Sequence, residues 1–485
     1  MKRRGKARRT SPSTADPWSA QMWAAATFGA VELPDRRLCL RAVRTAAALA
    51  AKPLDSIPQA HDNWGQSKAT YRFIENERVT VEALVKAEAE ATARRCAGRP
   101  EIRVLVDLTT LSFPHAHATE GLGPVGEEGS RGMLVQSALA VSESGVTLGL
   151  LDLLIWCRDP DQMGSRRQAK KRTIEEKESR RWLDAVRAVD AVIRRHVPEG
   201  RRPKIIFVFD REGDIHEAFD ECLARGHSFV IRCQYNRRVE DPTADVDEDP
   251  QVTYAHQAVR QSSLLARRTV AVPRKAGQPA RRTTVELRAI PVRLSPPRNH
   301  HPNRQPLLLN LVEVWEPHPP KGVKEPLHWR LWTPEPATTV SDVGRVQGIY
   351  QGRWHIEDYH KILKSGCRVE QLQFETANRL AKMIAFYAPI SARILRLRDS
   401  ARQEPDAPCT VVLSAIEWQA LWTKIHDALP PARCPPPTLR QAVLWIGRLG
   451  GHLNRKSDGM PGIKTLWLGW RDLLLLTHFY AIVRG

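Results

Sequence analysis

The sequence has few cysteines, and no two of them stand at the spacing of a metal or redox motif. Its 8 cysteines include no Cys-x-x-Cys pair, so neither a zinc ribbon nor a dithiol redox site is supported. In a chain of 485 residues, scattered thiols of this kind indicate a reduced protein of the cytoplasm. They lie at positions 39, 96, 157, 222, 233, 367, 409 and 434.

Long hydrophobic runs are also missing. The longest, residues 146–156, contains Asp152 and is too short to span a bilayer. The basic start is followed by no apolar segment, so a signal peptide is not expected. We find no Gly-x-Ser-x-Gly, Walker or His-Glu-x-x-His motif, so the chemistries of those motifs are not indicated. A soluble protein without a membrane partner is the expectation.

Acidic residues are scarce relative to basic ones. The chain has 74 Lys and Arg against 54 Asp and Glu, a net charge of +20. An excess of this size attracts polyanions, of which nucleic acid is the commonest that a soluble protein meets. A solvated basic surface without a partner is the alternative. The length predicts two or three domains.

The two ends of the chain read as helical. Residues 1–16 are basic and rich in Ser, Thr and Pro, which predicts a disordered arm. Residues 17–95 have helical periodicity and a basic face with Arg36 and Arg37, for which phosphate contact and a plain solvated face are both open. Residues 386–485 are predicted to form a second helical domain, with a Pro-rich break at 430–437.

The middle, residues 96–385, carries strand signals and predicts a mixed sheet covered by helices, an α/β fold. Residues 238–337 read as a β-rich insertion in this domain. The pair His300-His301 lies there in a loop of Pro and Asn, and a metal role for it is not favoured. The expected strands are 103–107, 133–141, 146–156, 205–209 and 228–232, with helices at 170–197 and 214–224.

One predicted helix carries an unusual stripe of side chains. On a continuous α-helix, Tyr350, Arg353, Glu357 and Lys364 fall within a sector of roughly 60°. Apolar residues of the segment lie opposite and can pack on the sheet. Taken alone, the stripe favours a solvated face with an Arg–Glu pair.

Two buried strands, each of which ends in an aspartate, change this interpretation. Asp107 follows Arg103-Val-Leu-Val, and Asp210 follows Ile205-Ile-Phe-Val-Phe. Either could be only a cap or turn residue. Together with Glu357, they supply the three carboxylates that a two-metal phosphodiester site requires, because Mg²⁺ binds a few carboxylates plus phosphate oxygens.

At this point the sequence resembles the bacterial DDE transposases of the insertion-sequence-four group, which have an RNase H-like core. Tyr350-x2-Arg353-x3-Glu357-x6-Lys364 fits that group's Tyr-Arg-Glu-Lys signature at every spacing. The segments that start at Asp107 and Asp210 are similar to its first and second catalytic motifs. Residues 69–76, 448–452 and 466–470 resemble its end-binding and dimerisation regions. Leu108 departs from the pattern, since a polar residue is common there.

The resemblance implies roles for single residues. Asp107, Asp210 and Glu357 would hold two Mg²⁺ ions, with Mn²⁺ tolerated. Tyr350, Arg353 and Lys364 would contact phosphates near the transposon end. Trp329 would stack on a flipped base; a core tryptophan of a β-strand is the alternative. Residues 17–95 would bind DNA ends, and Arg36, Arg37, Lys68 and Arg72 are the candidate contacts there.

The resemblance also implies a reaction and partners. A homodimer would pair two double-stranded transposon ends in the cytoplasm, associated with the nucleoid when DNA-bound. It would nick each end, form and reopen a hairpin, and join the 3′ ends to target DNA. A catalytically silent DNA-binding regulator and a stand-alone RNase H-like nuclease or resolvase are the competing interpretations.

Overall fold

The computed structural model describes residues 20–126, 129–160, 173–242, 252–272, 280–296, 305–455 and 458–484. The predicted arm 1–16 and the pair His300-His301 lie outside these residues. The chain divides into two compact units. The sheet unit comprises Thr92–Lys361 and Glu370–Ala377, and the helical unit comprises Met1–Ala91, Ile362–Val369 and Asn378–Gly485. The domain boundaries expected from the sequence stay a prediction.

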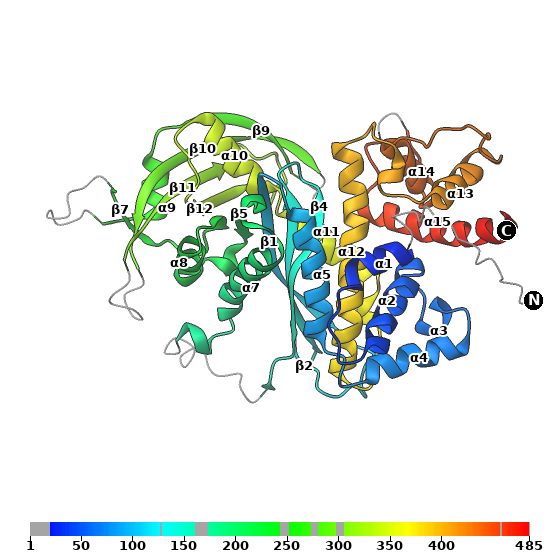
Figure 1. Cartoon of the computed structure of the whole chain (residues 1–485). Coiled ribbons are helices and arrows are strands. Elements are labelled where there is room, and N and C mark those ends of the chain that lie inside the picture. Colours follow the sequence, from blue (N-terminus) through cyan, green and yellow to red (C-terminus); the bar gives the residue numbers. More distant parts are fainter. Residues whose placement is uncertain are drawn as a thin grey trace, which may run out of the picture. The chain divides into compact units, whose positions relative to one another are not determined.

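The sheet unit is built on one 12-stranded mixed sheet (Figure 1). Its strands follow the order β2-β3-β1-β5-β6-β12-β11-β10-β7-β8, with β4 beside β3 and β9 beside β10. The strands are β1 (Glu101–Ser112), β2 (Gly123–Pro124), β3 (Arg131–Ser142), β4 (Thr147–Trp156), β5 (Lys204–Phe209), β6 (Ser228–Arg232), β7 (Arg238–Glu240), β8 (Thr253–Tyr254), β9 (Ala266–Val272), β10 (Arg281–Leu294), β11 (Leu307–Trp315) and β12 (His328–Thr333).

The central strands combine an antiparallel meander with a parallel pair. β1 pairs with β3, and β3 with β4, in antiparallel fashion, and Gly145 closes the β3–β4 turn at a φ of 89°. β1 and β5 are parallel, as are β5 and β6. All the strands expected here are confirmed. One detail is wrong: Asp107 does not end its strand, because β1 continues to Ser112 through antiparallel pairing with β3.

The predicted β-rich insertion extends this same sheet. β12 pairs with β6 in antiparallel fashion, and β11, β10 and β9 follow outward. A short helix that the sequence analysis did not expect, α9 (Ala255–Gln261), packs against β10 and β11. The insertion therefore shares the sheet of the core.

Alternation along the strands assigns the two faces of the sheet. Val104 and Val106 of β1, and Phe207 and Phe209 of β5, point into one hydrophobic core. α7 (Arg180–His196) and α8 (His216–Ala224) cover that face, and Trp182 of α7 packs on Phe209 at 5.0 Å between ring centroids (Figure 1). Since successive side chains of a strand point to opposite faces, the residues between these belong to the other face.

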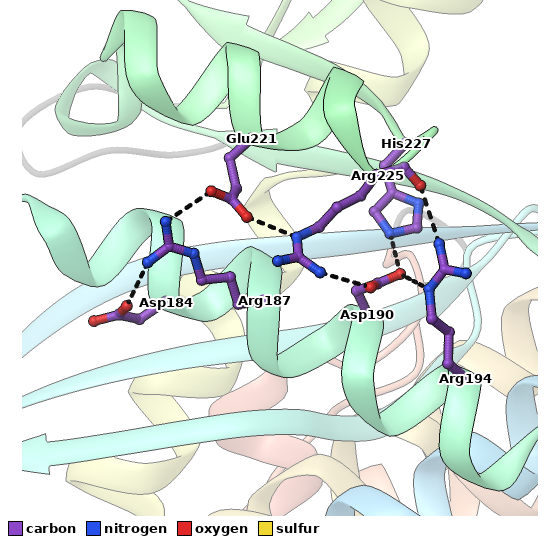
Figure 2. A network of polar contacts seen from close by, with 7 residues as sticks. All are labelled: Asp184, Arg187, Asp190, Arg194, Glu221, Arg225 and His227. Carbon is purple, nitrogen blue, oxygen red and sulfur yellow. Dashed lines mark hydrogen bonds and ion pairs between the residues drawn. The ribbon is translucent and has the colours of Figure 1, made fainter.

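Charged side chains fasten α7 to α8 (Figure 2). The Asp190 carboxylate, only 5% exposed, accepts hydrogen bonds from Arg194 at 2.7 Å and from Arg225 at 2.8 Å. Arg225 also donates to Glu221, which pairs with Arg187. Burial by itself would raise the pKa of Asp190, but the hydrogen bonds from the two arginines and His227 outweigh it and hold this pKa below its ordinary value.

The helical unit contains both ends of the described chain. α12 carries the buried Lys382, whose ammonium group donates to the carbonyls of Ile74 and Asn76, both at 2.9 Å. These carbonyls lie at the C-terminal end of α4, where backbone acceptors lack helical partners. The helices are α1 (Ala20–Phe28), α2 (Arg36–Ala51), α3 (Ile57–Ala60), α4 (Trp64–Glu75), most of α5 (Val81–Cys96), α12 (Ala377–Gln403), α13 (Ala415–His426), α14 (Leu439–Leu449) and α15 (Ile463–Arg484).

The helical prediction for both ends is confirmed in the described residues. The Pro-rich break separates α13 from α14, as expected. Capping boxes begin these two helices, at Ser414 with Glu417 and at Thr438 with Gln441. No described helix combines the length and the apolar character that crossing a membrane would require.

We predict that Asp190→Asn loosens the α7–α8 pair. A neutral amide cannot offset the arginines around it, and about 1–3 kcal/mol of local stability should be lost at pH 7. Because the pKa of Asp190 is depressed in the folded state, its contribution is present at neutral pH and is lost as the pH falls through that depressed pKa. Hydrogen exchange of α7 and α8 at pH 7 measures the change.

Asp184→Asn is the matched control. Asp184 belongs to the same network, but its side chain is 35% exposed and it pairs only with partly exposed arginines. Exposed pairs contribute about 0–1 kcal/mol. Equal exchange rates in the two variants would contradict the central position given to Asp190.

Candidate active site

Two aspartates lie side by side on the sheet face opposite α7 and α8. In the parallel pair, Val106 of β1 is in register with Phe209 of β5. Asp107 and Asp210, one residue further along, are therefore neighbours across strands about 4.8 Å apart. Asp210 leaves β5 and caps the short turn Arg211–Gly213, where its carboxylate accepts from the Glu212 amide at 2.8 Å. Capping does not exclude a second role for this residue.

The third carboxylate arrives on α11 (Trp354–Lys361), which packs against β1. Ile356 and Tyr359 on one side of this helix are buried, whereas Glu357 on another side is 52% exposed. The guanidinium of Arg353 contacts Asp107 at 3.3 Å through one nitrogen and hydrogen-bonds to Glu357 through the other. The residues at 107, 353 and 357 thus meet in space.

The predicted continuous helix over residues 350–364 is wrong. α10 (Val340–Gln351) ends before Gly352, and the chain passes through a tighter turn in which Arg353 N donates to Tyr350 O at 3.0 Å. After α11 follows a π-helical turn, Ile362–Gly366. Glycine is a poor helix former, and each change of helix type rotates the later side chains. The 60° sector therefore does not describe the stripe.

Charge and burial act strongly on Asp107. Its side chain is 16% exposed. Burial raises the pKa of Asp107 to about 7, Arg353 opposes the rise, and the charges of Asp210 and Glu357 add to it. The three carboxylates therefore act on one another electrostatically. His360, one turn after Glu357 on α11, also approaches Asp107, with 3.9 Å between Nδ1 and Oδ2.

A cationic residue that was not predicted from the sequence, Arg232, lies beside Asp210. Arg232, the last residue of β6, donates to the carbonyl of His328 at 3.0 Å and hydrogen-bonds to Tyr350. Burial lowers the pKa of Arg232, and the neighbouring Arg211 and Arg353 lower it further. Arg232 is the last residue of a buried strand, as Asp210 directly follows one, so the same signal could have selected it.

Trp329 lies in an aromatic cluster. It belongs to β12, is 6% exposed and meets the rings of Tyr350 and Trp354 edge-on, at centroid distances of 5.0 and 6.1 Å. Tyr350 itself is 4% exposed. The cluster joins the insertion to the turn that carries Arg353, and the role of Trp329 in base stacking stays a prediction.

The remaining candidate residues belong to the helical unit. Lys364 is half-buried in the π-helical turn, and Arg36, Arg37, Lys68 and Arg72 are exposed on α2 and α4. Arg37 lies 3.6 Å from Asp35, the N-cap of α2. Their roles stay predictions.

The chemistry of the donor set fits a hard divalent cation. The oxygen atoms of carboxylates suit such a cation, and here Asp107 is largely removed from water while the guanidinium of Arg353 contacts both Asp107 and Glu357. Such a cluster gains when a cation neutralises it. In the part of the chain that the structure describes, however, no three acidic, His or Cys side chains are arranged to hold one ion.

Proteins similar to this chain are found among family profiles and among solved structures. Three family profiles match: "Transposase DNA-binding" over residues 20–79, "Transposase DDE domain" over 152–389, and "Transposase Tn5 dimerisation domain" over 389–483. The second contains Asp210 and Glu357 but starts after Asp107. Among solved structures, a piggyBac transposase synaptic complex with hairpin DNA is similar, at 9% identity and a TM-score of 0.31, over 79% of this chain and 67% of that one.

The mixed sheet and the three family matches define a DNA transposase with an RNase H-like DDE domain. Its DNA-binding and dimerisation segments identify the family more closely. The chain belongs to the DDE transposases of the insertion-sequence-four group, of the Tn5-like kind. Divalent metal use is general for this domain.

We predict that Asp107→Asn stabilises the metal-free protein at pH 8. A raised folded-state pKa means that ionising Asp107 costs stability as the pH rises from its unfolded value through about 7. The amide removes this cost, up to about 4 kcal/mol for a shift of this size. Thermal melts in EDTA should show a higher Tm than wild type at pH 8 and little difference near pH 4.

Glu199→Gln supplies the control, because Glu199 is an exposed carboxylate of the same unit. Its melts should follow wild type at both pH values. A lower Tm for Asp107→Asn at pH 8 would show that Asp107 is not held at an electrostatic cost.

Proposed function

We propose that this protein is a cut-and-paste transposase that excises DNA by nicking, hairpin formation and hairpin opening, and then joins the 3′ ends to target DNA. The observation that supports the proposal is that Arg353 contacts both Asp107 and Glu357, while the parallel register of β1 and β5 puts Asp210 next to Asp107. Carboxylates from two central strands and a helix are what a two-metal phosphoryl-transfer site requires.

In this proposal the three carboxylates hold two Mg²⁺ ions, with Mn²⁺ tolerated. When bound, the ions would activate the attacking oxygen and stabilise the leaving one. Arg353, released from its carboxylate partners, becomes free to hold a phosphate, since guanidinium pairs well with either anion. In this proposal Arg353 pairs with the carboxylates or with a DNA phosphate.

Tyr350 and Lys364 complete the proposed phosphate contacts, and Trp329 is the proposed platform for a flipped base. Trp329 is buried and packs edge-on against Tyr350 and Trp354, so stacking on a base would require its surroundings to rearrange. Stacking on an aromatic ring suits an extruded base because every base has a π-face.

The helical unit would bind the transposon ends. Exposed Arg36, Arg37, Lys68 and Arg72 are the proposed phosphate contacts, in the segment that matches transposase DNA-binding domains. The segment that matches the Tn5 dimerisation domain would join two copies into a synaptic homodimer. We place the protein in the bacterial cytoplasm, at the nucleoid when it is DNA-bound.

The proposed reaction consists of four phosphoryl transfers at one site. Water attacks the transposon end and frees a 3′-OH; this hydroxyl attacks the opposite strand and closes a hairpin. A second water reopens the hairpin, and the same 3′-OH attacks target DNA. No protein nucleophile is needed, which agrees with the absence of a nucleophile motif in the sequence.

We predict that Glu357→Gln abolishes cleavage and leaves end binding within about twofold. The amide keeps the shape of the side chain but lacks the charge that holds a cation. A gel assay with Mg²⁺ and DNA of the terminal inverted repeat measures nicks and hairpins, and a mobility shift measures binding. EDTA should stop wild-type cleavage, and added Mg²⁺ or Mn²⁺ should restore it.

Glu143→Gln, in the exposed β3–β4 turn, is the control and should cleave like wild type. Normal nicking by Glu357→Gln would refute the assignment of the triad. Specific end binding by wild type without any cleavage in either metal would favour the silent regulator instead.

A further inference from the structure

Trp64 is exposed to solvent to a degree unusual for tryptophan. It is the first residue of α4 and is 66% exposed, and no other tryptophan in the described residues is among the exposed large hydrophobic side chains. Leaving so large an apolar surface in water has a cost that burial would remove. Neither the core of the helical unit nor the proposed phosphate contacts use this side chain.

The opposite face of α4 explains why the helix is held firmly. Ser67, Thr70, Phe73 and Ile74 are buried, and Thr70 hydrogen-bonds to His61 at 2.8 Å. The buried ammonium of Lys382 binds the C-terminal carbonyls. At the other end, Asn63 caps the helix by accepting from the Gln66 amide at 3.0 Å. α4 is therefore held at both ends and along its buried face, and its other face is exposed to solvent.

That free face combines an aromatic ring with cations. Trp64, Lys68 and Arg72 are spaced by four residues, so they form one exposed stripe. Glu75, further along the stripe, lies 3.9 Å from Arg379, which offsets its charge. The stripe is thus positive along its length and apolar at its start, which matches a phosphate backbone beside base edges.

We propose that Trp64 reads the sequence of the transposon end by packing on a thymine methyl group in the major groove. The proposal rests on the end-binding function proposed above. A major groove admits an α-helix, and the N-terminal residues of such a helix reach the bases. Trp64 stands at that end of α4. Lys68 and Arg72 follow at the spacing at which side chains reach phosphates, which hold the helix without reading sequence.

Binding measurements with two duplexes separate these roles. One duplex carries the inverted repeat that flanks the coding sequence, and the other carries the same bases shuffled. Trp64→Ala should weaken binding to the repeat about 5- to 100-fold and barely change binding to the shuffled duplex. Lys68→Ala should weaken both alike and reduce the salt dependence by about one unit of slope. Tyr254→Ala, an exposed aromatic of the sheet unit, is the matched control.

Replacing single thymines of the repeat by uracil locates the contact. At one or two positions, loss of the methyl group should weaken wild-type binding about fourfold and leave Trp64→Ala unaffected. Trp64→Phe should retain part of the discrimination. Circular dichroism checks that α4 stays folded in each variant.

Three outcomes would overturn the proposal: equal loss on both duplexes, no loss on either, or uracil effects that persist in Trp64→Ala. A change of oligomeric state in Trp64→Ala would assign the stripe to a second copy of the chain. If wild type fails to prefer the repeat at all, it is the proposed end-binding function that fails, so the two failures are distinguishable.

Discussion

The contact of Arg353 with Asp107 and Glu357 is the interaction that links the charged residues of the candidate site. Parallel pairing of β1 with β5 places Asp107 beside Asp210, and packing of α11 on β1 adds Glu357. Three negative groups in one partly buried place repel one another, and a cation must offset them. The guanidinium of Arg353 supplies a positive charge here and partly offsets this repulsion.

Stability and chemistry are divided between the two faces of the sheet. The face under α7 and α8 is filled by apolar side chains such as Phe209 and Trp182 and closed by the ion-pair network around Asp190. The opposite face carries the carboxylates, whose mutual repulsion opposes folding. Because alternate residues of the same strands serve both faces, the core fixes the positions of the charges without contacting them. A strand such as β5 contributes Phe207 and Phe209 to one role and Asp210 to the other.

Much of this arrangement follows from the sequence, and the exceptions have physical causes. Runs of apolar residues correctly predicted β1, β3, β4, β5 and β6, because strands that are buried in the core consist largely of apolar residues. The end of β1 was misplaced, since residues 108–112 gain their strand partners only from β3. The prediction of one continuous helix over 350–364 is wrong because hydrophobic periodicity does not reveal the turn at Gly352 or the π-helical turn after α11. His360 was missed because its neighbour Asp107 is distant in sequence, whereas Arg232 ends a buried strand and could have been selected by that signal.

In the helical unit, the face of α4 that packs in the core determines which face is exposed to a ligand. The charged side chain of Lys382 is buried, which is unfavourable unless hydrogen-bond partners stabilise the charge. Its ammonium group donates to two carbonyls at the C-terminal end of α4. These hydrogen bonds hold the C-terminal end of α4 in place. Trp64 is at the other end of α4. Because the residues of one helix keep fixed positions relative to one another, anchoring the C-terminal end of α4 also fixes the orientation of Trp64.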